Sequence, residues 1–553
     1  MTFGRLNSGG SRTNSKSGAL TQAMAHLNRH TTSPPWHRRL AQLALTFGLM
    51  LFLVAPTQAS RVGYGLSPYP IWSELTYFER DTLSDLHLAQ KNDPDALLAL
   101  YLLASGVRGN ADYETVRRRI GQFLTRAEKR IVEDDNKNLV GRLLNNEMHN
   151  FFFLQESHGG APNGYAMDQS RLMGIFETGE FNCISASLLY IVLSRHFDLS
   201  VQGVLLPSHA FVELRAEGRA IDVETTSALG YDQLHDAAFY ERNNNEWFSS
   251  RGLQPATFED YQQRERVSPT MLGARNMVNQ HTSKNQMDAD DSARLAEISA
   301  YIDPDNVIAQ EKRLYFYNRE IHALVTDQEW DALARLFKVT YGSVLRDGTR
   351  FPSNANMQLS LQMYLSGAML TYAEHGDIDQ TLEVMGQLLA RELPIDESGG
   401  KSGDSRQQIE ARITNAVSVL MTKLVERHRF NDGLLVLSLT EGHLKDPKAW
   451  PDMTNWFYLR WAEYFWQKSA WKDVVEVLSE YTAQPYFNKE ENNQPQELIS
   501  SAYYNWVLNL SQNNEMQAAQ DVVEQCNANP SHRGSCNKAQ KVLQHALKKA
   551  SAH

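Results

Sequence analysis

The chain has 553 residues, which is too long for one ordinary domain and predicts about two to four folded units. Its formal net charge is −11, because 65 acidic residues outweigh 54 basic ones. This balance leaves no domain-wide basic surface, so we expect no nucleic-acid partner.

A basic tail, residues 1–39, opens the chain and is followed by an apolar run, Leu40–Pro56. Small residues then surround a possible cleavage point after Ala59. This order is typical of an export signal. The run is slightly short for a membrane span of about 20 residues, whereas the long tail favours a retained anchor. We therefore predict a signal peptide or a single membrane anchor in residues 40–60, with a buried helix of a soluble domain as the alternative.

The remaining chain falls into parts of different character. Residues 61–140 carry amphipathic runs and predict helices. Residues 141–260 combine one short helix with strand-like runs, residues 261–300 are a predicted linker, and residues 301–553 are again helical. Together these parts indicate an α+β fold class.

The chain contains three cysteines, and export would place them in an oxidising compartment. Cys526 and Cys536 lie ten positions apart, and the Asn, Pro, Gly and Ser residues between them predict a turn joining two helical stretches. A disulfide there is the expected state, with two free thiols as the alternative. Such a pair would leave Cys183 alone, and an odd thiol in an exported protein is a candidate reactive group.

The C-terminal region shows a repeated pattern of helix end, polar turn, and apolar residue opening a second helix. The opening residues are Trp330, Ile378, Phe430, Trp471 and Met516, at spacings of 48, 52, 41 and 45. This array of helix hairpins resembles tetratricopeptide-like repeats, whose unit is about 34 residues and which would carry insertions here. Stacked repeats form extended binding surfaces, so we expect a protein or peptide partner. A non-repeating helical bundle is the alternative.

The stretch "GEFNCISASLLY" places Cys183 where a buried helix begins. The residues at i, i+4 spacing behind it form one stripe: Ile184, Leu188, Val192 and His196. A thiol at a helix start faces unpaired backbone N–H groups and the positive end of the helix dipole, which favour the thiolate. The same N–H groups are suited to hold an oxyanion.

Three strand-like runs follow this helix: "VQGVLLP", "HAFVELR" and "RAIDVETT", with "AEGR" as the turn between the last two. His209 opens the second run. Asp222 and Glu224 alternate with apolar residues, so they share one face of the third. The sequence therefore predicts a nucleophile helix packed on an antiparallel sheet.

Thiol catalysis needs a cysteine, a histidine that takes its proton, and a carboxylate that orients the imidazole. The stretches "FNCISASLLYIVLSRHFDLSVQGVLLPSHAFVEL" and "IDVETTSALG" resemble the transglutaminase-like superfamily, which has a papain-like core. The resemblance covers about residues 140–235 and implies a domain at 141–260. It assigns Cys183 as the nucleophile and His209 as the base. Glu224 is the third member, because "ETT" stands where the superfamily has "DPT"; Asp222 is the fallback.

We therefore expect an envelope-located thiol enzyme, a peptidase, an amidase or an acyl transferase, working through a thioester on Cys183. Export would place it on the periplasmic side of the inner membrane, attached through residues 40–56 or released. Envelope proteins or peptidoglycan peptides are the expected substrates. An inactive transglutaminase-like scaffold is the alternative. His196 does not stand at metal-ligand spacing from Cys183 or His209, so we expect neither a metal nor a cofactor.

Overall fold

The computed structural model divides the chain into two compact units, one within residues 60–409 and one containing residues 410–553. The described residues are 75–131, 136–153, 164–207, 209–240, 256–279, 289–391, 402–443, 448–488, 492–530 and 532–550. The predicted export segment lies outside these ranges. Among the described residues, no helix is both long and apolar enough to cross a membrane.

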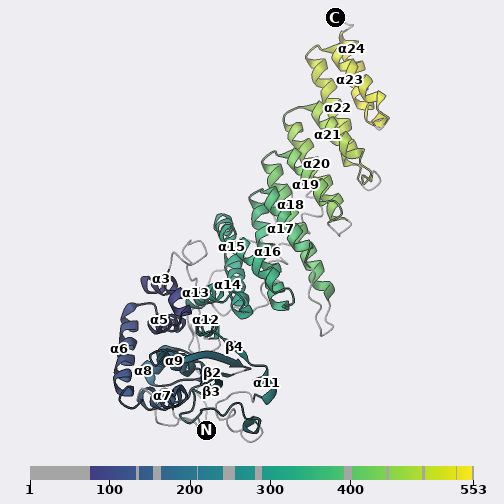
Figure 1. Ribbon diagram of the computed structural model, residues 1–553. Helices are drawn as coiled ribbons and strands as arrows, with labels where there is room; N and C mark the ends of the chain where they lie inside the picture. Colours follow the sequence, from purple (N-terminus) through teal and green to yellow (C-terminus); the bar gives the residue numbers. More distant parts are fainter. Residues whose placement is uncertain are drawn as a thin grey trace, which may run out of the picture. The chain divides into compact units, whose positions relative to one another are not determined.

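Among the described residues, the first unit begins with a run of helices (Figure 1). They are α3 (Tyr77–Ser84), α4 (Leu86–Gln90), α5 (Pro94–Ala104), α6 (Asn110–Ala127) and α7 (Lys137–Phe152). Helix α5 is apolar on all sides and almost wholly buried, as expected of a helix enclosed by others. Both α5 and α7 contact the helix that carries Cys183.

That helix is α9 (Cys183–Arg195), which follows the short α8 (Leu172–Thr178). Every residue of α9 from Cys183 to Ser194 is buried, which makes it the central helix of this unit. It ends where Asp198 adopts a left-handed conformation and the Leu199 N–H donates to the Ser194 carbonyl. This six-to-one bond closes the helix in a Schellman motif.

An antiparallel sheet in the order β3-β2-β1-β4 packs against α9 (Figure 1). Its strands are β1 (Ser200–Leu206), β2 (His209–Ala216), β3 (Arg219–Val223) and β4 (Glu265–Val267). The three strands predicted from the sequence are confirmed, whereas β4 was not predicted. Glu217 and Gly218 both have positive φ in the β2–β3 turn, as a type I′ turn requires. Helices and sheet together make the fold α+β, as predicted.

The two faces of the sheet serve different cores. Val212 and Leu214 belong to the main core that includes α9. On the other face, Phe211 packs with Tyr240 and Tyr261 in a smaller apolar cluster. Tyr261 lies in α11 (Phe258–Gln262), just before β4. The site residues His209 and Glu224 thus lie on elements buried from both sides.

The C-terminal region is helical, as predicted. The first unit continues with α14 (Val307–Thr326), α15 (Trp330–Arg350), α16 (Ala355–Glu374) and α17 (Ile378–Leu389). Before them, the predicted linker at 261–300 contains β4 and the helices α12 (Pro269–Asn279) and α13 (Ala289–Ile302), which were not predicted from the sequence. Helix α18 (Ser402–Glu426) spans the division between the units. The second unit then contains α19 (Phe430–Thr440), α20 (Ala449–Gln467), α21 (Trp471–Thr482), α22 (Gln494–Gln512), α23 (Met516–Ala528) and α24 (Asn537–Ala550).

Each residue predicted to open a second helix is the first residue of one: α15, α17, α19, α21 or α23. Two positions before each opener, the chain adopts a left-handed conformation: Gln328, Gly376, His428, Ser469 and Asn514. The next N–H then donates to a carbonyl five residues earlier, as from Glu329 to Leu324 and from Ala470 to Phe465. The five hairpins therefore share one turn, a Schellman motif that leads directly into the second helix.

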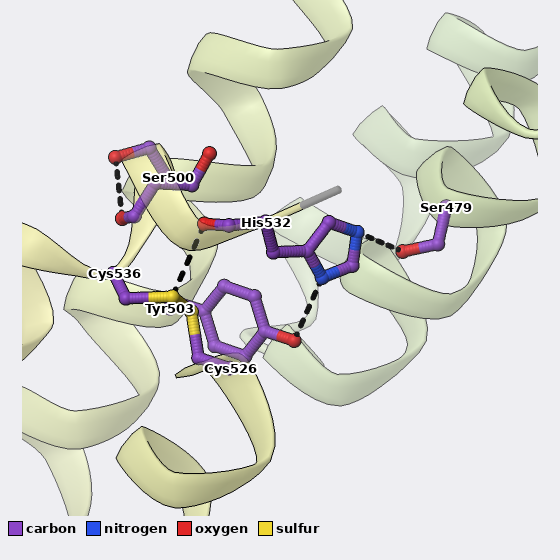
Figure 2. The surroundings of a disulfide bond; sticks show 7 residues. Ser479, Ser500, Tyr503, Cys526, His532 and Cys536 are labelled. Atoms are coloured by element: carbon purple, nitrogen blue, oxygen red, sulfur yellow. Dashed lines mark hydrogen bonds between the residues drawn. A yellow bond between two sulfur atoms is a disulfide. The ribbon is translucent and has the colours of Figure 1, made fainter. Parts of the chain in front are cut away.

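A disulfide joins Cys526 in α23 to Cys536, which precedes α24, so the predicted pairing is confirmed. Figure 2 shows that the loop between them is also held by the buried His532. Its ring lies 3.2 Å from the Tyr503 hydroxyl and 3.1 Å from the Ser479 hydroxyl. The C-terminal helix is thereby tied to α21 and α22.

Candidate active site

Cys183 is the first residue of α9 because Asn182 caps this helix. The Asn182 side-chain oxygen accepts hydrogen bonds from the Ile184 N–H at 2.9 Å and from the Ser185 N–H at 3.1 Å. In return, the Ser185 hydroxyl accepts from the Asn182 N–H at 2.9 Å. This reciprocal capping box fixes the helix start beside the thiol.

The capping corrects one detail of the sequence interpretation. We expected several unpaired N–H groups in the first turn, but Asn182 occupies those of Ile184 and Ser185. Within the described part of the chain, no acceptor faces the backbone N–H of Cys183 itself. A single first-turn amide, next to the sulfur, is therefore left for a ligand oxygen.

His209, the first residue of β2, lies between the thiol and a carboxylate. Its Nε2 is 2.6 Å from Glu224 Oε2, and the Cys183 side chain lies close enough to the same ring to raise its pKa. Since Nε2 faces Glu224, the other ring nitrogen is the one left for the thiol. The three side chains are nearly enclosed, with residue exposures of 7% for Cys183, 4% for His209 and 3% for Glu224.

Glu224 follows β3 directly and is held by its own turn. Its Oε1 accepts from the Thr226 N–H at 3.0 Å and from the Thr226 hydroxyl at 2.6 Å. Its backbone N–H donates to the Gly230 carbonyl at 2.7 Å. A Cβ on Gly230 would stand 2.5 Å from the Glu224 carbonyl oxygen, so only glycine allows the turn to close this tightly.

The site carries an ion pair. Burial alone would lower the pKa of His209, but the Glu224 carboxylate and the neighbouring Cys183 side chain raise it to about 10. Burial alone would likewise raise the pKa of Glu224, but the charge and hydrogen bond of His209, with the Thr226 donors, lower it. At neutral pH His209 is thus an imidazolium beside a carboxylate, which is the charge that stabilises a neighbouring thiolate.

Asp222, the fallback carboxylate, has a different partner. It stands opposite Glu213 across the β2–β3 ladder, and its Oδ2 accepts a hydrogen bond from the Tyr261 hydroxyl at 2.6 Å. Burial raises the pKa of Asp222, against the effect of the Tyr261 hydrogen bond. The structure thus brings Cys183, His209 and Glu224 together and directs Asp222 to Tyr261.

His196, weighed above as a metal ligand, lies just past the other end of α9. A helix of 13 residues is about 20 Å long at about 1.5 Å per residue, so His196 and Cys183 do not form one ligand set. Among the described residues, no three His, Cys, Asp or Glu side chains are grouped to hold a metal ion.

The sequence interpretation missed two buried polar residues of α7. His149 and Asn145 reach the turn that follows Glu224. Their one sequence signal is an i, i+4 spacing, which places both on the same helix face. That spacing does not predict which segment of the chain the two side chains contact.

Comparison with protein families identifies the class of the domain that contains these residues. Residues 114–265 match the model of the transglutaminase-like superfamily. The match runs from α6 to β4 and includes Cys183, His209 and Glu224. This part of the chain is therefore a transglutaminase-like domain, as the resemblance predicted. Comparisons with curated proteins and with solved structures gave no match.

Proposed function

We propose that the transglutaminase-like domain is a thiol enzyme that cleaves or transfers acyl groups through a thioester on Cys183. The observation that carries the proposal is the position of His209, which bonds Glu224 and lies close enough to the Cys183 side chain to interact with it electrostatically. A histidine placed between a helix-start thiol and a carboxylate has the geometry of an activated cysteine nucleophile.

In the proposed reaction, the proton of Cys183 resides on His209, and the thiolate attacks the carbonyl carbon of an amide. The Cys183 N–H donates to the oxyanion that forms. As the C–N bond breaks, His209 gives its proton to the leaving amine, and the acyl group stays on sulfur. Water or a second amine then gives a proton to His209 and attacks the thioester, which releases the acid or the new amide together with the free thiol. Glu224 keeps the imidazole oriented and stabilises its charge throughout.

The setting of this chemistry is part of the proposal. We place the protein on the periplasmic side of the inner membrane, exported by residues 40–60 and anchored through residues 40–56 or released. Disulfides persist in oxidising compartments, so the Cys526–Cys536 bond supports an exported location. Envelope proteins or peptidoglycan peptides are the proposed substrates, and the helix hairpins recruit a protein or peptide partner.

The proposal is tested by trapping the acyl group on the full chain. Wild type, Cys183→Ala and His209→Ala are incubated with membrane extract, and the peptide that contains residue 183 is analysed by mass spectrometry. A hydroxylamine-sensitive adduct on Cys183 is expected in wild type, and none in Cys183→Ala. Absence of any adduct in wild type, with thiol alkylation no faster than that of a free thiol, would overturn the proposal.

The low exposure of Cys183 and His209 favours one alternative, an inactive scaffold that binds its partner without turnover. Iodoacetamide at pH 6 separates the two functions, because only a thiolate reacts quickly at this pH. Stoichiometric labelling of Cys183 supports the enzyme. Labelling at the rate of an ordinary thiol supports the scaffold.

A further inference from the structure

Helix α7 holds the turn that carries Glu224 by two side chains one helical turn apart. The His149 Nε2 lies 3.0 Å from the Thr225 carbonyl oxygen, and the Asn145 Nδ2 lies 2.9 Å from the Ser227 carbonyl oxygen. A carbonyl only accepts, so His149 must carry its proton on Nε2. Both helix residues are buried, so the two bonds are shielded from competing water.

The same turn is tied to the nucleophile helix by Thr225. Its hydroxyl lies 3.0 Å from the hydroxyl of Ser187, which is four residues after Cys183 in α9. Thr225 and Ser187 are both fully buried. Thr225 is thus hydrogen-bonded to α7 through its carbonyl oxygen and to α9 through its hydroxyl, and it directly follows Glu224 in the chain.

His149 also packs against the segment of chain that precedes Cys183. Its ring stands edge-on to Phe181, with centroids 5.7 Å apart, and edge-on to Phe153 at 4.6 Å. Phe181 precedes Cys183 by two residues and is stacked on Phe153 at 3.8 Å. One imidazole therefore contacts the segment before the nucleophile and the segment after the acid.

From this geometry we infer that His149 is a positioning residue for the thiol site: by holding the Thr225 carbonyl, it fixes Glu224 in the orientation that bonds His209. The inference rests on the proposed thiol chemistry of Cys183. Asn145 holds the same turn, so His149 and Asn145 together form what we call the α7 clamp. Thr225 and Ser187 connect this turn to α9.

The protonation state of His149 agrees with this role. Burial lowers its pKa to about 4, although the Thr225 carbonyl and the Glu224 charge act in the opposite direction. At neutral pH the ring is therefore uncharged and donates a single fixed N–H to Thr225. A charged ring here would compete with His209 for the carboxylate.

The test compares His149→Leu, which removes the donor, with His149→Gln, which keeps an amide N–H at the reach of Nε2. The readout is the rate of Cys183 alkylation by iodoacetamide between pH 5 and 10 in the full chain, which needs neither substrate nor turnover. In His149→Leu we expect the labelling rate at pH 6 to fall about tenfold, equivalent to a loss of about one pKa unit of ion-pair stabilisation. His149→Gln restores most of the wild-type rate.

Ser187→Ala removes the second connection while leaving α7 intact, and we expect a smaller fall in the same direction. A folded His149→Leu protein with the wild-type pH profile would overturn the inference, because a purely structural histidine changes stability and not thiol reactivity. If His149→Leu does not fold, an unchanged profile in Ser187→Ala overturns it instead. Failure of the proposed function would be seen separately, in the wild-type protein. There, Cys183 would carry no acyl adduct and would be labelled no faster than a free thiol.

Discussion

His209 Nε2 and Glu224 Oε2 lie 2.6 Å apart, and their contact joins the first residue of β2 to the residue after β3. The pair is almost completely buried, and its charges stabilise each other. The properties of the thiol site follow from how firmly this contact is maintained.

The first prediction concerns which carboxylate serves His209. Glu224→Gln keeps the side-chain shape and removes the charge, so the imidazolium and the thiolate beside it both lose stability. We expect Cys183 alkylation at pH 6 to fall at least about tenfold, since an adjacent opposite charge is worth about 1 to 3 pKa units. Asp222→Asn is the matched control and changes this rate little, because Asp222 bonds Tyr261. Equal effects of the two variants would contradict the assignment.

The second prediction is a pH dependence of stability. The pKa of His209 is raised from 6.5 to about 10, so its contribution to stability is complete below pH 6.5 and is lost as pH rises towards 10. The pKa of Glu224 is lowered from 4.5, so its contribution is present above pH 4.5 and is lost on further acidification. The contact is therefore strongest between about pH 4.5 and 6.5.

Native-state hydrogen exchange of β2 amides measures this effect, because it reports the opening of the strand that carries His209. The opening free energy of wild type should fall between pH 6.5 and 10. In His209→Asn, which has no titrating ring, the fall should be much smaller. Parallel curves for the two proteins would show that the ion pair does not contribute to the stability of β2.

The order of the site residues could be read from the sequence because each stands at the start or end of a strongly patterned element. Cys183 begins an apolar helix, His209 begins an alternating strand, and Glu224 directly follows the next one. Alternation puts Asp222 and Glu224 on the same face, so it could not choose between them. The choice depends on the turn after β3, where Thr226 and Gly230 orient Glu224.

The α7 clamp was beyond sequence reasoning for a different reason. His149 and Thr225 are 76 positions apart, and Asn145 and Ser227 are 82 apart. Such contacts depend on how helices and sheet pack, which no local pattern specifies. Strand β4 was missed because its three residues, Glu265–Val267, are too few to show an alternation.

The third prediction concerns the C-terminal disulfide. Replacing both Cys526 and Cys536 by serine opens a ten-residue loop, and loop-closure entropy assigns such a loop about 2.5 kcal/mol. We expect the free energy of local opening of α24, measured by hydrogen exchange, to fall in this variant. Wild type treated with a reductant should show the same fall. The reductant should have no further effect on the serine variant. Unchanged protection of α24 in both proteins would mean that the contacts of His532 hold the loop without the disulfide.

The fourth prediction uses the turn that the five hairpins share. Ser469 has a φ of 56° between α20 and α21, a left-handed conformation that costs a residue with a Cβ about 1–2 kcal/mol. Glycine avoids that cost but loses more backbone entropy on folding, so Ser469→Gly should stabilise the second unit by about 0.5–1 kcal/mol. Denaturant unfolding of the purified chain, followed by the fluorescence of the tryptophans in α20 and α21, measures the change.

The matched control is the same substitution at Ser438, an exposed residue inside α19 with ordinary helical conformation. There glycine adds backbone entropy with no strain to relieve, so Ser438→Gly should destabilise by about 0.5–1 kcal/mol. Opposite signs for one substitution at two exposed serines are the signature expected of a strained left-handed turn. If both variants are destabilised, the hairpin turns tolerate a side chain at this position without strain. The Schellman bond from Ala470 to Phe465 would then be enough to hold the turn.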